Sequence, residues 1–443
     1  MKNFDTIISR GTVVSHRGES VIDVGISNGK IAAIGNLVAA KGNEIFDAKG
    51  LHILPGLIDT QVHFREPGMV LSEDIEKGTC GAVLGGITGV FEMPNTIPPT
   101  DSANALNNKI QIAENDAWCN FAFYIGGTKE NADELHLLEK LPGCCGIKVF
   151  MGASTGNLLV PDDTTLSSIL KNGFRRVAVH CEDNEMLRNR DQFRTTDVSS
   201  HAIWRNEETA LIATQRLVNL ARLHGRRIHV LHVTTKQEIE LLKASKDIAT
   251  VEVTPQHLTL VSPDCYNQLG TKAQMNPPIR GKSHNEALWQ AISDGVADII
   301  GSDHAPHTLE EKNKGYPNTP SGMPGVQTTL PIMLDHVSNG NLSLINLIDM
   351  MCYAPVRFFG LVNKGRIAVG YDADLTIVDL KLKKQITDSW IASKCGWTPY
   401  HNKKVCGWPV ATVVGGMFAM KNGELLDKPK NKMYKFFESG HYN

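Results

Sequence analysis

The sequence lacks several features that would place the protein in a special class. It has no apolar run of the about 20 residues that a membrane helix needs, and its start, Met1 to Asp5, lacks the apolar stretch of a signal peptide. It has no long basic or acidic run, and its formal net charge is -2, so we expect neither nucleic acid nor an anionic membrane as a partner. Its nine cysteines include no CxxC pair, which favours reduced thiols in the cytoplasm over a disulfide framework.

What is present is the composition of an ordinary globular protein. Hydrophobic residues make up 42% of the chain and charged residues 21%. A length of 443 residues is enough for one large core and a smaller domain.

Both ends of the chain alternate apolar and polar positions, which predicts short strands. The expected strands are Thr6–Ile8, Val21–Ile26 and Ile31–Ile34 near the start, and Arg366–Val369, Ala373–Val378 and Val410–Val414 near the end. Neither terminal piece is large enough for a good sandwich core alone. We therefore predict that residues 1–52 and 361–443 pair into one small β-sandwich domain.

Between the termini, strand-like runs alternate with helix-like ones. The runs are Ile53–Ile58, Thr88–Met93, Asn120–Ile125, Gly146–Met151, Arg176–His180, Arg227–His232, Ala249–Val253 and Ala297–Ile300. Eight such strands, each followed by enough chain for a helix, predict an α/β fold with a (β/α)8 TIM-type barrel over residues 53–360. The clearest helices are Glu207–Leu223, with Gly225 just beyond its end, and Gln237–Ala244.

Polar side chains lie in or directly after several of these strands: His63, Lys148, His180, His232 and Asp303. Closure of a barrel brings the carboxyl ends of its strands to one mouth, where barrel enzymes do their chemistry. Imidazole and carboxylate are the ligands of catalytic zinc, which keeps a coordination position open for water. Each residue alone has a bland explanation, such as a satisfied core histidine, but their convergence by chance is improbable. We therefore predict a metal site.

Lys148 is flanked by Ile147, Val149 and Phe150, which places its amine in a buried strand. An unpaired buried ammonium is costly. The lysine either pairs with a carboxylate or has taken up carbon dioxide to form a carbamate that could bridge two cations. Spacing alone leaves both explanations open.

Several motifs carry a family resemblance over nearly the whole chain. They are Asp59–Gly68, Met93–Thr96, Gly146–Gly152, Met275–Arg280 and Gly301–His307. On these motifs the chain resembles the dihydroorotases of the amidohydrolase superfamily, of the class I-like type with a bridging lysine.

The resemblance assigns roles by position. It implies a carboxylated, metal-bridging lysine at Lys148, second-metal histidines at His180 and His232, and a metal ligand and general base at Asp303. It implies one or two Zn²⁺ ions as cofactor. The substrate contacts that it implies are Arg65, Asn95, Asn276 and His307, and Gly322–Gly325 resembles the stretch that contacts the substrate ring.

One position departs from the family. The usual His-x-His after the first strand is Gln61-Val62-His63 here. An amide oxygen is a poorer zinc ligand than imidazole. The first metal would then rest on His63, the Lys148 carbamate and Asp303. The site could be binuclear with a weak first metal, mononuclear, or inactive; we favour an active enzyme, because the other functional positions match.

The implied activity is the reversible hydrolysis of dihydroorotate to N-carbamoyl-L-aspartate in pyrimidine synthesis, with a small molecule as the substrate. Hydantoinase and allantoinase share the barrel and the lysine, but Arg65 with Met93–Asn95 favours a ring that carries a carboxylate. A rival of another class is a non-catalytic subunit that scaffolds a carbamoyltransferase, for which Gln61 is the best support. A homodimer is compatible with all of these. Residues 153–157 could be a lid, though a connecting loop is equally plausible.

Overall fold

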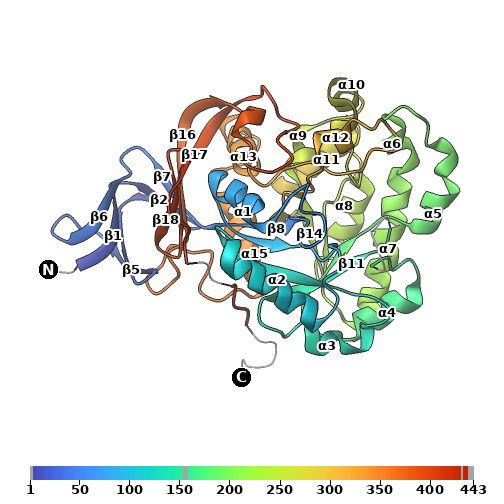
Figure 1. Cartoon of the computed structure of the whole chain (residues 1–443), viewed down its shortest axis with the longest axis horizontal. Coiled ribbons are helices and arrows are strands. Elements are labelled where there is room, and N and C mark those ends of the chain that lie inside the picture. The colour runs from blue at the N-terminus through green and yellow to red at the C-terminus, as the bar shows by residue number, and fades with distance from the viewer. Residues whose placement is uncertain (1–2, 153–157, 431–432, 438–443) are drawn as a thin grey trace.

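The structure is a computed structural model that describes residues 3–152, 158–430 and 433–437. Two bodies lie side by side in it (Figure 1): a β domain at the N-terminal end of the picture and a larger body in which helices cover strands. The stretch 153–157, suggested by the sequence as a lid or a connecting loop, lies outside the described residues.

The larger body is the predicted barrel. Its eight strands neighbour one another in chain order and every pairing is parallel. The strands are β8 Leu57–Val62, β9 Ile87–Glu92, β10 Asn120–Gly126, β11 Cys144–Phe150, β12 Val177–His180, β13 Ile228–Val230, β14 Ala249–Val253 and β15 Ile299–Ile300. The ring closes just beyond β15, where Val62 bridges to His304 and the His63 amide donates to the His304 carbonyl at 2.7 Å.

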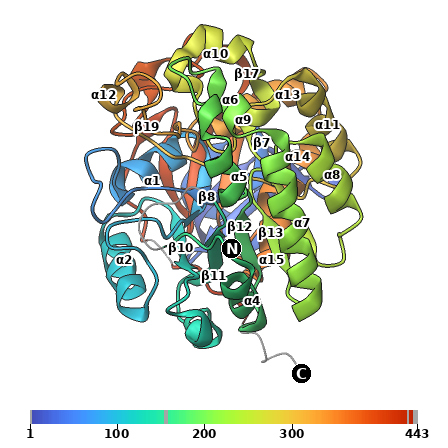
Figure 2. The ribbon, with the colours of Figure 1, turned by 90° about the vertical axis from the view of Figure 1, so that its right-hand side faces the viewer.

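Both faces of the barrel strands are buried, as a parallel barrel requires. In β10, for example, every residue of the sequence NFAFYIG is buried. Helices surround the strands when the molecule is turned by 90° (Figure 2). The longer ones are α1 Ile75–Leu84, α2 Ala103–Asp116, α4 Asp163–Lys171, α7 Glu207–His224, α8 Lys236–Lys243, α11 Lys282–Ser293 and α13 Thr329–Ser338. The short ones are α3 Leu135–Leu138, α5 Asn184–Asn189, α6 Ser200–Trp204, α9 Pro255–Thr259, α10 Asp264–Leu269, α12 Leu309–Lys312, α14 Leu344–Ile348 and α15 Ala354–Phe359.

The two helices expected from the sequence are present. α7 begins after Asn206, whose side chain accepts a hydrogen bond from the Thr209 amide, and it ends at Gly225 with φ of 62°. α8 begins with a capping box between Thr235 and Glu238. No helix in the described part of the chain combines the length and apolarity needed to cross a membrane.

The prediction of one strand over Ile53–Ile58 is wrong. The structure divides this run into β7 His52–Pro55, which pairs with β16 and β2 in the β domain, and barrel strand β8. Gly56 separates them, and a Cβ there would collide with Thr88 and Asp374. The barrel strand therefore runs further than expected, and Gln61 lies inside β8 rather than after it. We propose Gly56 as the boundary between the two domains.

Both termini contribute to the β domain, as predicted. One sheet has the order β5-β4-β1-β6, and the other has the order β19-β18-β17-β16-β7-β2-β3, which joins C-terminal to N-terminal strands. The remaining bounds are β1 Asn3–Ser9, β2 Thr12–Ser15, β3 Gly18–Val21, β4 Asp23–Ser27, β5 Lys30–Gly35, β6 Lys41–Asp47, β16 Leu375–Gln385, β17 Lys404–Val414, β18 Met417–Lys421 and β19 Glu424–Leu425. Ile8 and Val24 from the first sheet share a core with Leu375 and Val413 from the second.

Two expected strands differ in detail. Residues 366–369 form no strand, so their apolar alternation belongs to an irregular connection before β16. The run 21–26 spans the end of β3 and most of β4, with Ile22 between them. Alternation alone does not separate two strands that follow each other without a turn signal.

Candidate active site

The carboxyl ends of the barrel strands bring the predicted site residues together. His63 follows β8, Asn95 follows β9, Lys148 lies in β11, His180 ends β12, and the remaining two positions, His232 and Asp303, follow β13 and β15. They line a cavity of about 90 Å³ with Gln61, Arg65, Phe150, Asn276, Ala305, Ser321 and Gly322. Of the predicted site residues, His307 is not part of this lining, and of the Gly322–Gly325 stretch only Gly322 is.

On one side of the cavity two imidazoles face each other. His180 Nδ1 lies 3.1 Å from His232 Nε2, and the other nitrogen of His180, Nε2, donates to Glu182 at 2.8 Å. Glu182 therefore fixes the tautomer that leaves a lone pair on His180 Nδ1. Burial lowers the pKa of both histidines, that of His232 strongly. We call His180 and His232 the histidine pair.

On the opposite side His63 and Gln61 both approach Asp303. His63 Nε2 lies 3.2 Å from Asp303 Oδ1, and Gln61 Nε2 donates to the same oxygen at 3.0 Å. His63 Nδ1 lies 2.7 Å from Asn95 Oδ1, so each ring nitrogen of His63 faces an oxygen that can only accept. Burial lowers the pKa of His63. We call His63 and Asp303 the aspartate side.

Lys148 lies in β11 with 1% of its surface exposed. Its Nζ has no hydrogen-bond partner and sits 4.3 Å from the centre of the Phe150 ring. Burial lowers the pKa of the amine to about 7, although Asp303 and other acidic groups oppose the shift. A sizeable fraction of the amine is then uncharged near neutral pH and able to act as a nucleophile. The pairing with a carboxylate that the sequence left open is absent in the described residues.

The donor set fits a divalent cation. No group of three or more His, Cys, Asp or Glu side chains among the described residues is arranged to hold a metal on its own. However, Lys148 and Gln61, which line the cavity, each have a buried polar atom without a hydrogen-bond partner, Nζ and Oε1. Such orphaned polar atoms are rare unless an ion, water or ligand satisfies them. Neutral imidazoles and an uncharged amine that could be carboxylated are suitable ligands for zinc.

Gln61 stands where the resemblance leads one to expect an imidazole. Asp303 is a carboxylate that only accepts, so the amide nitrogen of Gln61 must face it. Gln61 therefore restrains Asp303 as a hydrogen-bond donor.

Arg65 and Asn95 line the cavity from the loops after β8 and β9. Arg65 is buried and donates from Nε to the Pro306 carbonyl at 3.3 Å, and one of its guanidinium nitrogens lies 3.2 Å from His307 Nε2, which also lies 3.1 Å from the Ser321 carbonyl. His307 thus lies behind Arg65, and burial lowers its pKa to about 4. This position favours a role for His307 in orienting the Arg65 guanidinium rather than in contacting a substrate.

Four residues near the cavity were not expected from the sequence. Phe150, Ala305 and Ser321 line it, and Glu182 supports His180 from behind. The sequence offered one signal. Glu182 stands two positions after His180, and in an extended chain side chains two positions apart point to the same side.

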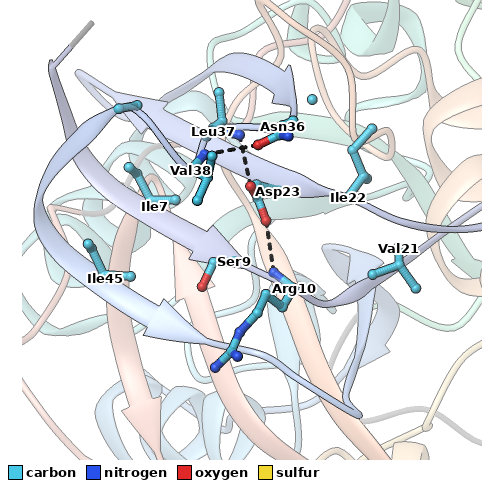
Figure 3. Close-up of a pocket in the computed structure, with 12 residues that line it drawn as sticks. Ile7, Ser9, Arg10, Val21, Ile22, Asp23, Asn36, Leu37, Val38 and Ile45 are labelled. Atoms are coloured by element: carbon cyan, nitrogen blue, oxygen red, sulfur yellow. Dashed lines mark hydrogen bonds between the residues drawn. The ribbon is translucent and has the colours of Figure 1, made fainter. Parts of the chain in front are cut away.

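A larger cavity, of about 780 Å³, lies in the β domain (Figure 3). Its lining is mostly aliphatic, and its carboxylate, Asp23, accepts hydrogen bonds from the backbone amides of Arg10 and Leu37 at 2.8 Å each. No histidine, cysteine or lysine is among the described residues that line it. The barrel mouth, not this cavity, holds groups suited to catalysis.

Comparison with known sequences agrees with this geometry. Residues 52–418 match the amidohydrolase family. A dihydroorotase of Methanothermobacter thermautotrophicus is 35% identical over 413 residues, which is 92% of each chain. A dihydroorotase of Pyrococcus furiosus is 34% identical and covers 92% of this chain and 91% of its own.

Solved structures show the same fold. The L-hydantoinase (dihydropyrimidinase) of Arthrobacter aurescens superposes with a TM-score of 0.92 at 29% identity, over 97% of this chain and 99% of that one. The dihydropyrimidinase of Brevibacillus agri gives a TM-score of 0.90 at 26% identity, over 98% and 99%. On the family match, the sequence relatives and the shared barrel together, the chain belongs to the amidohydrolase family.

Proposed function

We propose that the chain is a dihydroorotase, a cyclic amidase that opens dihydroorotate to N-carbamoyl-L-aspartate and closes it in reverse for pyrimidine synthesis. The observation that carries this proposal is the curated relatives named dihydroorotase, 34 to 36% identical over most of the chain. The cavity adds independent support, because a buried guanidinium stands beside groups suited to hydrolysis.

For the cofactor we propose zinc. The histidine pair and a carboxylated Lys148 would hold one ion, and the aspartate side with the same carbamate would hold a second, weaker one. When bound, zinc polarises a substrate carbonyl and lowers the pKa of water from about 15.7 to about 7. Because Gln61 supplies no imidazole to the aspartate side, we expect the zinc occupancy of that side to be lower than that of the histidine pair.

Asp303 is proposed as the general base and acid. Its carboxylate accepts the proton of the attacking water and returns it to the ring nitrogen as the amide bond breaks. Asp303 has φ of 44°, in the left-handed region, and His63 and Gln61 hold one of its oxygens. These contacts orient the carboxylate, which limits the reorganisation needed when the proton moves.

Arg65 is proposed to bind the substrate carboxylate. A guanidinium presents a planar fork of donors that matches the two oxygens of a carboxylate. Asn95 and Asn276 contribute amide groups to the same cavity, and His307 holds Arg65 from behind. A substrate without the carboxylate would leave the buried guanidinium unpaired, which is costly.

The second candidate function is that of a hydantoinase, favoured by the TM-scores of 0.92 and 0.91 with L-hydantoinase and D-hydantoinase. The test is a comparison of kcat/KM for dihydroorotate, hydantoin and allantoin with purified, zinc-supplied protein. We expect dihydroorotate to be preferred by about 100-fold or more, the worth of a charge-assisted clamp. A preference for hydantoin or allantoin would reject the proposal.

The same assay tests the non-catalytic scaffold for a carbamoyltransferase. The purified chain alone should open dihydroorotate once zinc is supplied. Absence of turnover, with co-purification of a carbamoyltransferase, would instead support the scaffold.

A further inference from the structure

The short helix α6 and the residue after it lie between two parts of the proposed active site. On one side is the Met275–Arg280 stretch, which contributes Asn276 to the cavity; on the other is Glu182, which supports His180. His201 and Arg205 are 1% and 3% exposed, and neither lines the cavity. They can act on the reaction only through other residues.

His201 orients Asn276. Its Nε2 lies 3.0 Å from the Met275 carbonyl and 2.9 Å from Asn276 Oδ1. Because the carbonyl can only accept, Nε2 carries the proton and the amide oxygen of Asn276 faces His201. The amide nitrogen of Asn276 is thereby left free for the cavity. The hydroxyl of Tyr316 lies 3.4 Å from Nδ1 of His201 on its other edge.

Arg205 orients His180 through Glu182. Its guanidinium forms a buried ion pair with Glu182 Oε2, the same oxygen that accepts from His180 Nε2. Because a carboxylate oxygen accepts from both partners, this contact holds His180 in the tautomer that carries its proton on Nε2.

The two contacts belong to one unit. The backbone amide of Arg205 donates to the His201 carbonyl at 3.0 Å, so one helical turn joins them. Arg280, at the far end of the Met275–Arg280 stretch, donates to the Arg205 carbonyl and, at 3.3 Å, to Thr234 Oγ1 shortly after His232. Movement of α6 would displace Asn276, the proposed substrate contact, and His180, the proposed metal ligand, together.

We infer that His201 and Arg205 are positioning residues: His201 fixes the substrate amide donor Asn276, and Arg205 fixes the metal ligand His180, with α6 coupling the two. The inference rests on the proposed function and assigns separate tasks within it. Loss of His201 should weaken substrate binding, and loss of Arg205 should weaken zinc binding.

The first test replaces His201 by Phe, which keeps an aromatic ring at this position but has no ring nitrogen. We expect KM for dihydroorotate to rise about 10-fold, the worth of one hydrogen bond, with kcat and zinc content little changed. His201→Gln, which restores a donor, should recover part of the loss. His336→Phe on α13, a histidine bonded to Thr259 and outside the site, is the matched control and should leave KM unchanged.

A double-mutant cycle separates positioning from general damage. In an Asn276→Ala background, His201→Phe should raise KM no further, because the group that it positions is gone. An equal rise in both backgrounds would overturn the role of His201.

The second test measures zinc affinity by competition with a chromophoric chelator, without any turnover assay. Arg205→Met should weaken zinc binding about 10- to 100-fold. Arg205→Lys keeps the charge and should weaken zinc binding by less, and it serves as the test variant if Arg205→Met does not fold. Arg216→Met is the control, because Arg216 pairs with Asp163 and with Asp183, the neighbour of Glu182, but not with Glu182. Unchanged zinc affinity in both Arg205 variants would overturn this part of the inference.

The results also separate this inference from the proposed function. If the wild-type protein opens dihydroorotate while His201→Phe and Arg205→Met match it in KM and zinc affinity, the inference fails and the function stands. If the wild-type protein does not open dihydroorotate, the proposed function fails, and a weaker zinc affinity in Arg205→Met still supports the metal-side role.

Discussion

The two sides of the barrel mouth are built differently. Around the histidine pair, imidazole nitrogens lie 3.1 Å apart and a buried ion pair, Glu182 with Arg205, supports them from behind. On the aspartate side an amide, Gln61, stands near His63 and donates to Asp303. Under the proposed function, the first side presents lone pairs to a cation, whereas the second holds the carboxylate that takes up and returns the proton. Lys148, without a partner, lies in a strand between them.

Removing Lys148 should affect both sides and give the largest effect. With Lys148→Ala we expect zinc content to fall and kcat to drop by more than about 10³-fold, because the proposed bridging carbamate and the polarisation that depends on it are lost together. Acetate or propionate should restore part of the activity, with sodium chloride at equal ionic strength as the control. Near-normal turnover and zinc content in the variant would reject the carbamate.

Removing the charge of Asp303 should separate the two sides. For Asp303→Asn we expect kcat to fall about 10²- to 10⁴-fold, the range for a general acid–base group, while the zinc bound at the histidine pair remains. Zinc content by elemental analysis beside steady-state kinetics tests this. Loss of all zinc would show instead that Asp303 is required for metal binding on both sides.

Replacing Arg65 by Met should weaken binding of the carboxylate but not the chemistry. We expect KM for dihydroorotate to rise about 10- to 100-fold, since a hydrogen-bonded charge pair is worth about 1.5–3 kcal/mol. Dihydrouracil, the same ring without the carboxylate, should be turned over no more slowly by the variant. An equal loss for both rings would assign Arg65 a structural role.

The smallest effect should come from making the aspartate side resemble the histidine pair. Gln61→His offers the imidazole that the family usually has there, and we expect zinc content to rise by up to one ion per chain. Unchanged zinc content would show that Gln61 does not limit occupancy.

Much of the fold could be predicted from the sequence, because buried parallel strands give continuous apolar runs that are easily recognised. The error over Ile53–Ile58 has a physical cause. One apolar run feeds two sheets, and only Gly56, which must approach Thr88 and Asp374 closely, marks the change.

The convergence of the residues at the mouth could be expected because each lies in or shortly after a barrel strand, as Lys148 lies in β11 and His63 follows β8. The supporting contacts were not. Arg205 and His201 come from a short helix whose packing against Glu182 and Asn276 depends on long-range geometry. His307 was expected at the substrate; its side chain contacts Arg65 and does not line the cavity, and its substrate role stays a prediction.

The most direct test of the account is an anomalous difference map, measured at the zinc edge, from crystals grown with zinc. We expect a peak between His180 and His232, with electron density continuous from Lys148 Nζ to a carboxylate at the same site. A fully zinc-loaded crystal with no peak at the barrel mouth, or with a bare amine on Lys148 beside the metal, would contradict it.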